Sequence, residues 1–212
     1  MLRRSILLTV LASPALAQER FVPTTAETPE GAALVARLRA GGLVLFFRHA
    51  DTVGEPCDRS FRVGDRAGQR GISPRGVEQS REIGRRLAAL GFPASAPVLA
   101  GPVYRARDTA EAAFGAGNVR VTDSLLADDF SGPRLDWVLA EHRRLFSEAV
   151  PRGMNRVLVG HRTPAIMVAG ERVGGQAFPE GGALVIEPRD TRFAVLGILM
   201  LAPVEGGGFH GC

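Results

Sequence analysis

The chain has 212 residues, of which 45% are hydrophobic and 23% charged, as in an ordinary soluble globular protein with one full core. Its formal net charge is +4, and all of its basic residues are arginine. Because the sequence has no basic run, no interleaved aromatic residues and no nucleic-acid-binding motif, we expect no nucleic acid among its partners.

The N-terminal residues 1–17 have the pattern of a secretory signal peptide. Arginines precede the apolar stretch 6–12, and Ala15-Leu16-Ala17 follows it as a cleavage site. A membrane anchor is the alternative, but this stretch is shorter than the roughly 20 apolar residues that span a bilayer. We therefore expect a nearly neutral mature protein, residues 18–212, that forms a single domain, is periplasmic or secreted, and has no stable membrane insertion.

Helix and strand patterns alternate along the rest of the chain. Apolar residues at helical spacing, together with capping residues, predict helices over residues 29–40, 73–90, 103–114, 133–150 and 163–169. Short apolar runs predict strands over residues 43–47, 97–100, 119–121, 156–159, 183–187 and 193–201. This order predicts a three-layer α/β/α sandwich with a mostly parallel sheet and a C-terminal antiparallel hairpin. The glycines at 206–208 predict a mobile tail.

Two histidines directly follow apolar strands. Arg48-His49-Ala50 comes after the run 43–47, and His161 comes after the run 157–160. Because ligands bind at the carboxyl ends of strands in α/β sheets, both imidazoles are candidate site residues. Taken alone, an Arg-His pair is a weak signal, since a histidine near a strand end is more often a polar residue with hydrogen-bond partners and no catalytic role.

Two further segments make the pattern specific. Gly71-Ile72-Ser73-Pro74-Arg75-Gly76 and Gly101-Pro102-Val103-Tyr104-Arg105-Ala106-Arg107-Asp108-Thr109-Ala110 each open a helix between the two strands. With the two histidine segments, their order and spacing resemble the histidine phosphatase superfamily, which includes phosphoglycerate mutases and small bacterial phosphohistidine and sugar phosphatases. The resemblance covers about residues 42–169.

The sequence departs from the family pattern in two places. Ala100-Gly101 stands where the family usually has serine before the proline, and Arg162-Thr163 stands where glycine often follows the second histidine. The charged core positions are present, so we expect these departures to affect the shape of the pocket more than the reaction.

The resemblance implies a phosphomonoester hydrolase. In this interpretation, His49 is the nucleophile that becomes a phosphohistidine, while Arg48 and Arg105 hold the phosphate through guanidinium groups. His161 contributes a further donor from the neighbouring strand, and Arg70 is a secondary phosphate ligand. We expect a small phosphorylated substrate, a phosphorylated sugar or an envelope metabolite, with no metal and no cofactor; the sequence does not specify the oligomeric state.

The proton donor is left open by the sequence. Asp128 best matches the family's Leu-x-Glu pattern, with aspartate in place of glutamate, and Asp129 is the second candidate. Some family members lack such an acid, and a pair of solvated aspartates before a helix is an equally good interpretation of either residue. A non-catalytic phosphate-binding protein of the same fold is therefore the alternative function. A mutase is disfavoured because export offers no obvious glycolytic substrate.

Several other residues are assigned no catalytic role. Cys57 and Cys212 lack the spacing of a zinc site, and export would allow them to form a disulfide, with two free thiols as the alternative.

The long loop 51–71 is expected to line the substrate entrance, where its arginines contact further anionic groups or are simply solvated. His142, at a helix-surface spacing, and His210, in the tail, are expected to have no role.

Overall fold

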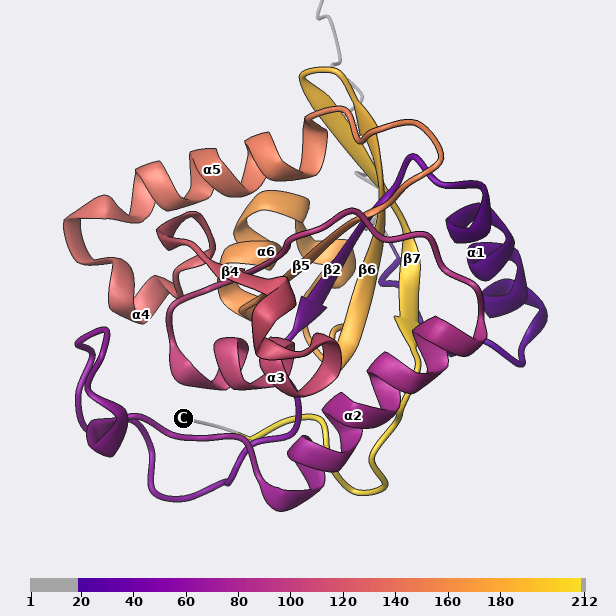
Figure 1. The fold of residues 1–212 in the computed structure, drawn as a ribbon. Helices are drawn as coiled ribbons and strands as arrows, with labels where there is room; N and C mark the ends of the chain where they lie inside the picture. Colours follow the sequence, from indigo (N-terminus) through magenta and orange to yellow (C-terminus); the bar gives the residue numbers. More distant parts are fainter. Residues whose placement is uncertain (1–18, 211–212) are drawn as a thin grey trace, which may run out of the picture.

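The sheet at the centre of the molecule has seven strands in the computed structural model, which describes residues 19–210 (Figure 1). Their order across the sheet is β1-β7-β6-β2-β5-β3-β4. The strands are β1 Thr24–Thr25, β2 Val44–Arg48, β3 Val98–Ala100, β4 Val119–Val121, β5 Arg156–Gly160, β6 Gly182–Arg189 and β7 Arg192–Met200. The pairs β2·β5, β5·β3, β3·β4 and β1·β7 are parallel, and β6 runs antiparallel to both β2 and β7. The predicted mostly parallel sheet with a C-terminal hairpin is confirmed.

Helices cover both faces of this sheet. They are α1 Pro29–Ala40, α2 Pro74–Ala89, α3 Tyr104–Phe114, α4 Asp128–Ser131, α5 Leu135–Ser147 and α6 Arg162–Ala169. Short 3₁₀ turns lie at Arg66–Gly68, Ala116–Asn118, Asp123–Leu125, Gly132–Arg134 and Glu171–Val173. Helices α1, α2 and α3 lie on one side of the sheet and α5 and α6 on the other, which gives the predicted three layers (Figure 1).

Strand β2 shows why both faces are covered. Leu45 and Phe47 pack into the core under α1, α2 and α3, whereas Val44 and Phe46 pack into the core under α5 and α6. Every residue of this strand is buried. Because successive side chains of a strand point to opposite faces, a continuous apolar run fits a strand that is buried on both sides.

The helix starts follow from the capping residues. The Ser73 hydroxyl accepts a hydrogen bond from the Gly76 amide at the start of α2, and Thr28 does the same for Gly31 in α1. A proline stands at the first position of both helices, where its missing N–H costs nothing. Helix α5 is shorter than predicted because residues 132–134 form a 3₁₀ turn and the helix ends at Ser147.

The strand register brings the two histidine segments to the same edge of the sheet. Arg48, the last residue of β2, pairs with Gly160, the last residue of β5. The next residues, His49 and His161, therefore leave neighbouring parallel strands side by side. Strand β3 lies on the other side of β5 and leads into α3, which carries Arg105. The sheet thus positions the candidate site before any side-chain contact is considered.

Three further features differ from the sequence predictions. His142 is fully buried in α5 and is not on its surface. The glycines at 206–208, predicted to form a mobile tail, instead lie against the body of the protein, where the Gly208 carbonyl accepts hydrogen bonds from the Glu180 amide and the Arg48 side chain. Strand β1, two residues long, was not predicted because so short a segment carries no periodicity.

No helix within residues 19–210 combines the length and the apolar character that a membrane crossing requires. The expected signal peptide, residues 1–17, lies outside the described residues.

Candidate active site

His49 is held in one orientation by backbone contacts. Its amide donates to the Gly160 carbonyl of β5, and its ring Nδ1 donates to the Ala50 carbonyl over 3.0 Å. Because Nδ1 carries the hydrogen, Nε2 keeps its lone pair. Burial lowers the pKa of His49 well below its usual value, and the neighbouring Arg48 and Arg105 guanidinium groups lower it further. His49 is therefore a neutral imidazole with an available nucleophilic nitrogen.

His161 faces His49 across the site. The two ring centroids are 5.5 Å apart. His161 lies directly before α6, and its Nε2 is buried without a hydrogen-bond partner among the described residues. Burial lowers the pKa of His161 well below the usual range, and the positive charge of Arg105 lowers it further. The predicted convergence of the two histidines is confirmed.

Arg48 is buried at the end of β2, beside His49. Its Nη1 donates to the Phe178 carbonyl over 3.0 Å and to the Gly208 carbonyl over 3.2 Å, and its Nη2 donates to Glu180 Oε1 over 3.3 Å. Burial lowers the pKa of Arg48 to about 10, while Glu180 raises it. The side chain stays cationic at neutral pH and is held from several directions.

Arg105 and Arg70 both contact the Asp58 carboxylate. Arg105, in the first turn of α3, lies 2.9 Å from Asp58 Oδ2, and the Arg70 amide donates to Asp58 Oδ1 over 2.6 Å. Burial lowers the pKa of Arg105, partly offset by the Asp58 charge. Asp58 therefore pairs with the Arg105 guanidinium and anchors the backbone at Arg70. This role could not be predicted, because Asp58 lies in an irregular loop and belongs to no motif.

These side chains line one cavity of about 120 Å³. Its lining residues are Arg48, His49, Arg70, Arg105, Ala127, Asp128, Asp129, His161, Arg162, Thr163 and His210. All the residues predicted as site residues are thus brought together, and Arg162, Thr163 and His210 join them.

Most buried side-chain polar atoms that lack a hydrogen-bond partner in residues 19–210 belong to this cavity. They are Arg48 Nε, Arg70 Nε and a terminal nitrogen, Arg105 Nε, Arg162 Nε and His161 Nε2. A buried donor without a partner costs about 1–3 kcal/mol, so a group of them in one place is unusual unless a ligand pairs with them. Phosphate oxygens are suited to this role because they accept several hydrogen bonds from guanidinium groups at once.

Asp128 and Asp129 lie at the cavity wall at the start of α4. Asp128 is half-buried and Asp129 is exposed. Burial raises the pKa of Asp128, and the neighbouring Asp129 charge raises it further. Asp128 is therefore the better candidate of the two for a proton donor.

The other arginines of the loop 51–71 do not reach this cavity. Arg66 pairs with Asp108 at 2.7 Å and lies over the Tyr104 ring, Arg59 donates to the Ala67 carbonyl, and Arg62 is exposed. Within this loop, Arg70 is the arginine that lines it. Cys57 lies in the same loop, but Cys212, its expected disulfide partner, lies outside the described residues.

Asp51, Glu180 and His210 form a second cluster next to the cavity, and in residues 19–210 it is the one group of acidic and imidazole side chains close enough to share a cation. Both carboxylates already have cationic neighbours, since Arg48 lies 3.3 Å from Glu180 and Arg75 lies 3.7 Å from Asp51. Sequence reasoning missed Glu180 and dismissed His210, because the three residues are far apart in the chain and no motif connects them.

No protein-family model and no curated protein sequence matches the chain. The solved structure of the protein histidine phosphatase SixA complexed with tungstate matches at a TM-score of 0.51 and 16% identity, covering 75% of this chain and 97% of that one. The chain has the histidine phosphatase fold. The resemblance found in the sequence is confirmed at the level of the fold.

Two other solved structures are similar at lower TM-scores. The mycobacterial glucosyl-3-phosphoglycerate phosphatase matches with a TM-score of 0.48 and 18% identity, over 73% of this chain and 96% of that one. Phosphoserine phosphatase from Entamoeba histolytica, in complex with 3-phosphoglyceric acid, matches with a TM-score of 0.47 and 12% identity, over 72% of this chain and 96% of that one.

Proposed function

We propose that the protein is a metal-independent phosphomonoester hydrolase that acts through a phosphohistidine at His49. The observation that carries this proposal is a neutral imidazole with a fixed tautomer in a cavity lined by arginines. Several buried N–H groups of these arginines lack hydrogen-bond partners within residues 19–210. This combination supplies a nucleophile and a binding site for a phosphate dianion in one place.

In the first step, the lone pair of His49 Nε2 attacks phosphorus, and the bond from phosphorus to the ester oxygen breaks. Arg48, Arg105 and Arg70 hold the equatorial phosphate oxygens, and His161 adds a hydrogen bond. The leaving alkoxide takes a proton from Asp128, the carboxyl group whose pKa is raised by burial and by the neighbouring Asp129. The products of this step are an alcohol and the phosphohistidine.

In the second step, water attacks phosphorus and the phosphorus–nitrogen bond breaks. Asp128, now ionised, accepts a proton from the water, and inorganic phosphate leaves. The arginines carry the charge stabilisation that a metal would otherwise supply, so the scheme routes no step through a metal ion.

The size of the cavity limits which part of a substrate it can enclose. A volume of about 120 Å³ accommodates a phosphoryl group but little of what is attached to it. The rest of the substrate therefore lies outside, towards the loop 51–71 and α4. A phosphorylated sugar or an envelope metabolite fits this arrangement, and the proposed export from residues 1–17 would place the enzyme where envelope compounds are available.

A non-catalytic phosphate-binding protein is the second candidate. The same cationic cavity would serve it, and it is favoured if neither aspartate assists the leaving group. The two candidates differ in turnover but not in phosphate binding.

The deciding experiment compares the wild type with His49→Ala and with His142→Gln, a substitution of a buried histidine that does not line the cavity. We expect His49→Ala to lose hydrolysis of an aryl phosphate by at least about 10³-fold, as removal of a covalent nucleophile does, and His142→Gln to retain it. A wild type that binds orthophosphate without hydrolysing any phosphomonoester in a broad screen would favour the binding protein. Loss of turnover in EDTA, restored by added metal, would contradict the metal-independent scheme.

A further inference from the structure

The C-terminal segment, residues 205–210, reaches the cavity, and His210 is one of the residues that line it. We propose that its His210 is a third imidazole of the phosphate site, oriented by Glu180, so that the C-terminus of the chain completes the substrate pocket. This inference rests on the proposed function only in requiring that the cavity binds phosphate, with or without turnover.

The backbone of the segment is attached to the phosphate site at Gly208. Its carbonyl accepts hydrogen bonds from Arg48 over 3.2 Å and from the Glu180 amide over 2.9 Å. The ring of Phe209 lies 5.4 Å from the Arg48 guanidinium and 5.9 Å from that of Arg162. Both arginines line the cavity, so the segment contacts the phosphate site itself and not only the surrounding surface.

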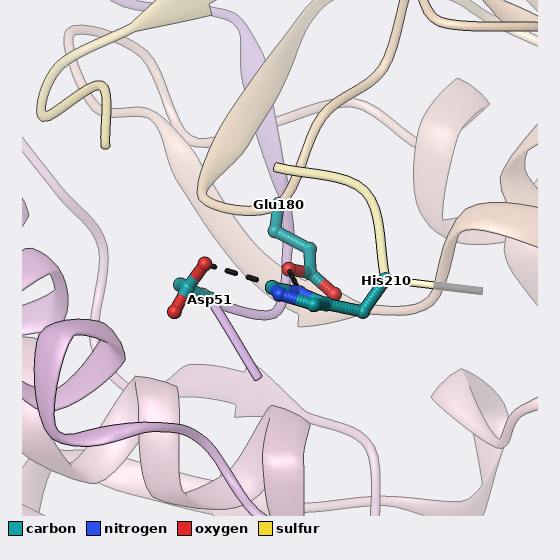
Figure 2. A group of neighbouring side chains, drawn as sticks. All are labelled: Asp51, Glu180 and His210. Atoms are coloured by element: carbon teal, nitrogen blue, oxygen red, sulfur yellow. Dashed lines mark hydrogen bonds and ion pairs between the residues drawn. The ribbon is translucent and has the colours of Figure 1, made fainter. Parts of the chain in front are cut away.

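Glu180 orients the His210 ring. His210 Nδ1 lies 2.9 Å from Glu180 Oε2, and it also lies 3.9 Å from Asp51 Oδ1, between the two carboxylates (Figure 2). Glu180 is fixed in turn by the Thr52 hydroxyl at 2.9 Å and by Arg48. Because a carboxylate accepts the hydrogen of Nδ1, the ring is held in one orientation.

The charges around this cluster favour an anion over a metal ion as the ligand of His210. Arg48 and Arg75 already neutralise the two carboxylates, and the adjoining cavity carries Arg70, Arg105 and Arg162. A divalent cation would be repelled by all of these guanidinium groups, whereas a phosphate dianion would be attracted. His210 lines the cavity together with His49 and His161. With Nδ1 bonded to Glu180, the other ring nitrogen, Nε2, donates to a phosphate oxygen when the ring carries a hydrogen on both nitrogens, because Glu180 and the phosphate are both acceptors.

A purely structural role is the alternative, in which His210 only ties the segment to Glu180. The two roles use different nitrogens of the ring. Asparagine places an amide where Nδ1 lies but has no atom at the position of Nε2. His210→Asn therefore keeps the tie to Glu180 and removes the proposed contact with phosphate, while His210→Ala removes both.

The test is the affinity for orthophosphate, measured by titration calorimetry on the whole chain. We expect His210→Ala and His210→Asn each to bind orthophosphate about tenfold more weakly than the wild type, the effect of one lost hydrogen bond to a charged group. Glu205→Ala, a change to an exposed side chain of the same segment, should bind as the wild type does. Thermal unfolding of each variant shows that it is folded.

Three results would overturn the proposal. Wild-type affinity in His210→Ala would show that the ring does not contribute. Wild-type affinity in His210→Asn with weak binding in His210→Ala would leave His210 as a tether alone. A wild type that binds no orthophosphate would remove the phosphate site and the proposed function together, whereas binding without hydrolysis would contradict only the proposed turnover and leave this test in force.

Discussion

Asp128 and Asp129 are adjacent carboxyl groups in different surroundings, and this difference favours Asp128 as the proton donor of the proposed reaction. Asp128 is half-buried with a raised pKa, whereas Asp129 is exposed. We expect Asp128→Asn to lower kcat for an alkyl phosphate on the order of 10²-fold and to affect an aryl phosphate much less, because a good leaving group needs little protonation. Asp129→Asn is the matched control. Equal losses on both ester types would remove Asp128 from this role, and a larger alkyl-specific loss in Asp129→Asn would transfer the role to Asp129.

His142 links pH to stability. It is fully buried against Phe46 and Phe146, and burial lowers its pKa to about 4 from an ordinary 6.5. Below pH 6.5 the unfolded chain binds a proton that the folded chain does not bind until about pH 4. The contribution of neutral His142 to the free energy of unfolding is therefore fully present above pH 6.5. This contribution falls by about 1.4 kcal/mol per pH unit as the pH decreases towards 4.

His49 and His161 contribute in the same direction, since burial lowers both of their pKa values. We expect the free energy of unfolding of His142→Gln to fall less steeply than that of the wild type between pH 6.5 and 4. Urea unfolding across this range measures the slope. Parallel slopes for the two proteins would mean that His142 titrates normally in the folded state.

At the residue scale, the sequence predicted those site residues that belong to local motifs. Arg48, His49 and His161 follow from apolar runs that end in a charged or imidazole side chain, and Arg105 from a helix start. Asp58, Glu180 and His210 could not be predicted, because each enters the site through contacts between segments far apart in the chain. The burial of His142 was missed although Val138, Leu145 and Phe146 share its face of α5.

At the scale of elements, the start of α2 depends on the Ser73 side chain, which also contacts Asp51 beside the cavity. The Ser73 hydroxyl accepts from the Gly76 amide and donates to Asp51 Oδ2. We expect Ser73→Ala to lower the free energy of unfolding by about 1 kcal/mol, the usual cost of a lost N-cap, and somewhat more because Asp51 loses a buried partner. Thr28→Ala, which removes the cap of α1 far from the site, is the control. A stability change within a few tenths of a kcal/mol for Ser73→Ala would contradict this role.

Most element boundaries could be predicted because they are set locally. Caps, prolines and glycines mark the ends of α1, α2 and α3, and continuous apolar runs mark β2 and β5. The loop 51–71 and the C-terminal segment could not be described from sequence, because their courses are set by contacts such as Asp58 with Arg105 and Gly208 with Arg48. These irregular segments bring Asp58 and His210 to the site.

At the scale of the whole molecule, export and the disulfide between Cys57 and Cys212 remain proposals. Export would place both thiols in an oxidising compartment, where a bridge would connect the loop 51–71 to the chain end beside the cavity. We expect the exported protein to begin at Gln18 and to take up alkylating reagent at cysteine only after reduction, as measured by intact mass. An N-terminus at Met1 would contradict export, and two alkylated cysteines without reductant would contradict the bridge.

The central claim is that His49 becomes covalently phosphorylated. An aryl phosphate makes the first step fast, so the phosphoenzyme should accumulate in a single turnover. The most direct measurement is rapid mixing of the wild type with such a substrate, quenching at alkaline pH where phosphohistidine survives, and mass spectrometry of the peptide that contains His49. The predicted result is one phosphoryl group on His49 that forms and decays at rates compatible with turnover and is absent in His49→Ala. Turnover with no phosphorylated peptide, or with the phosphoryl group on another residue, would contradict the account.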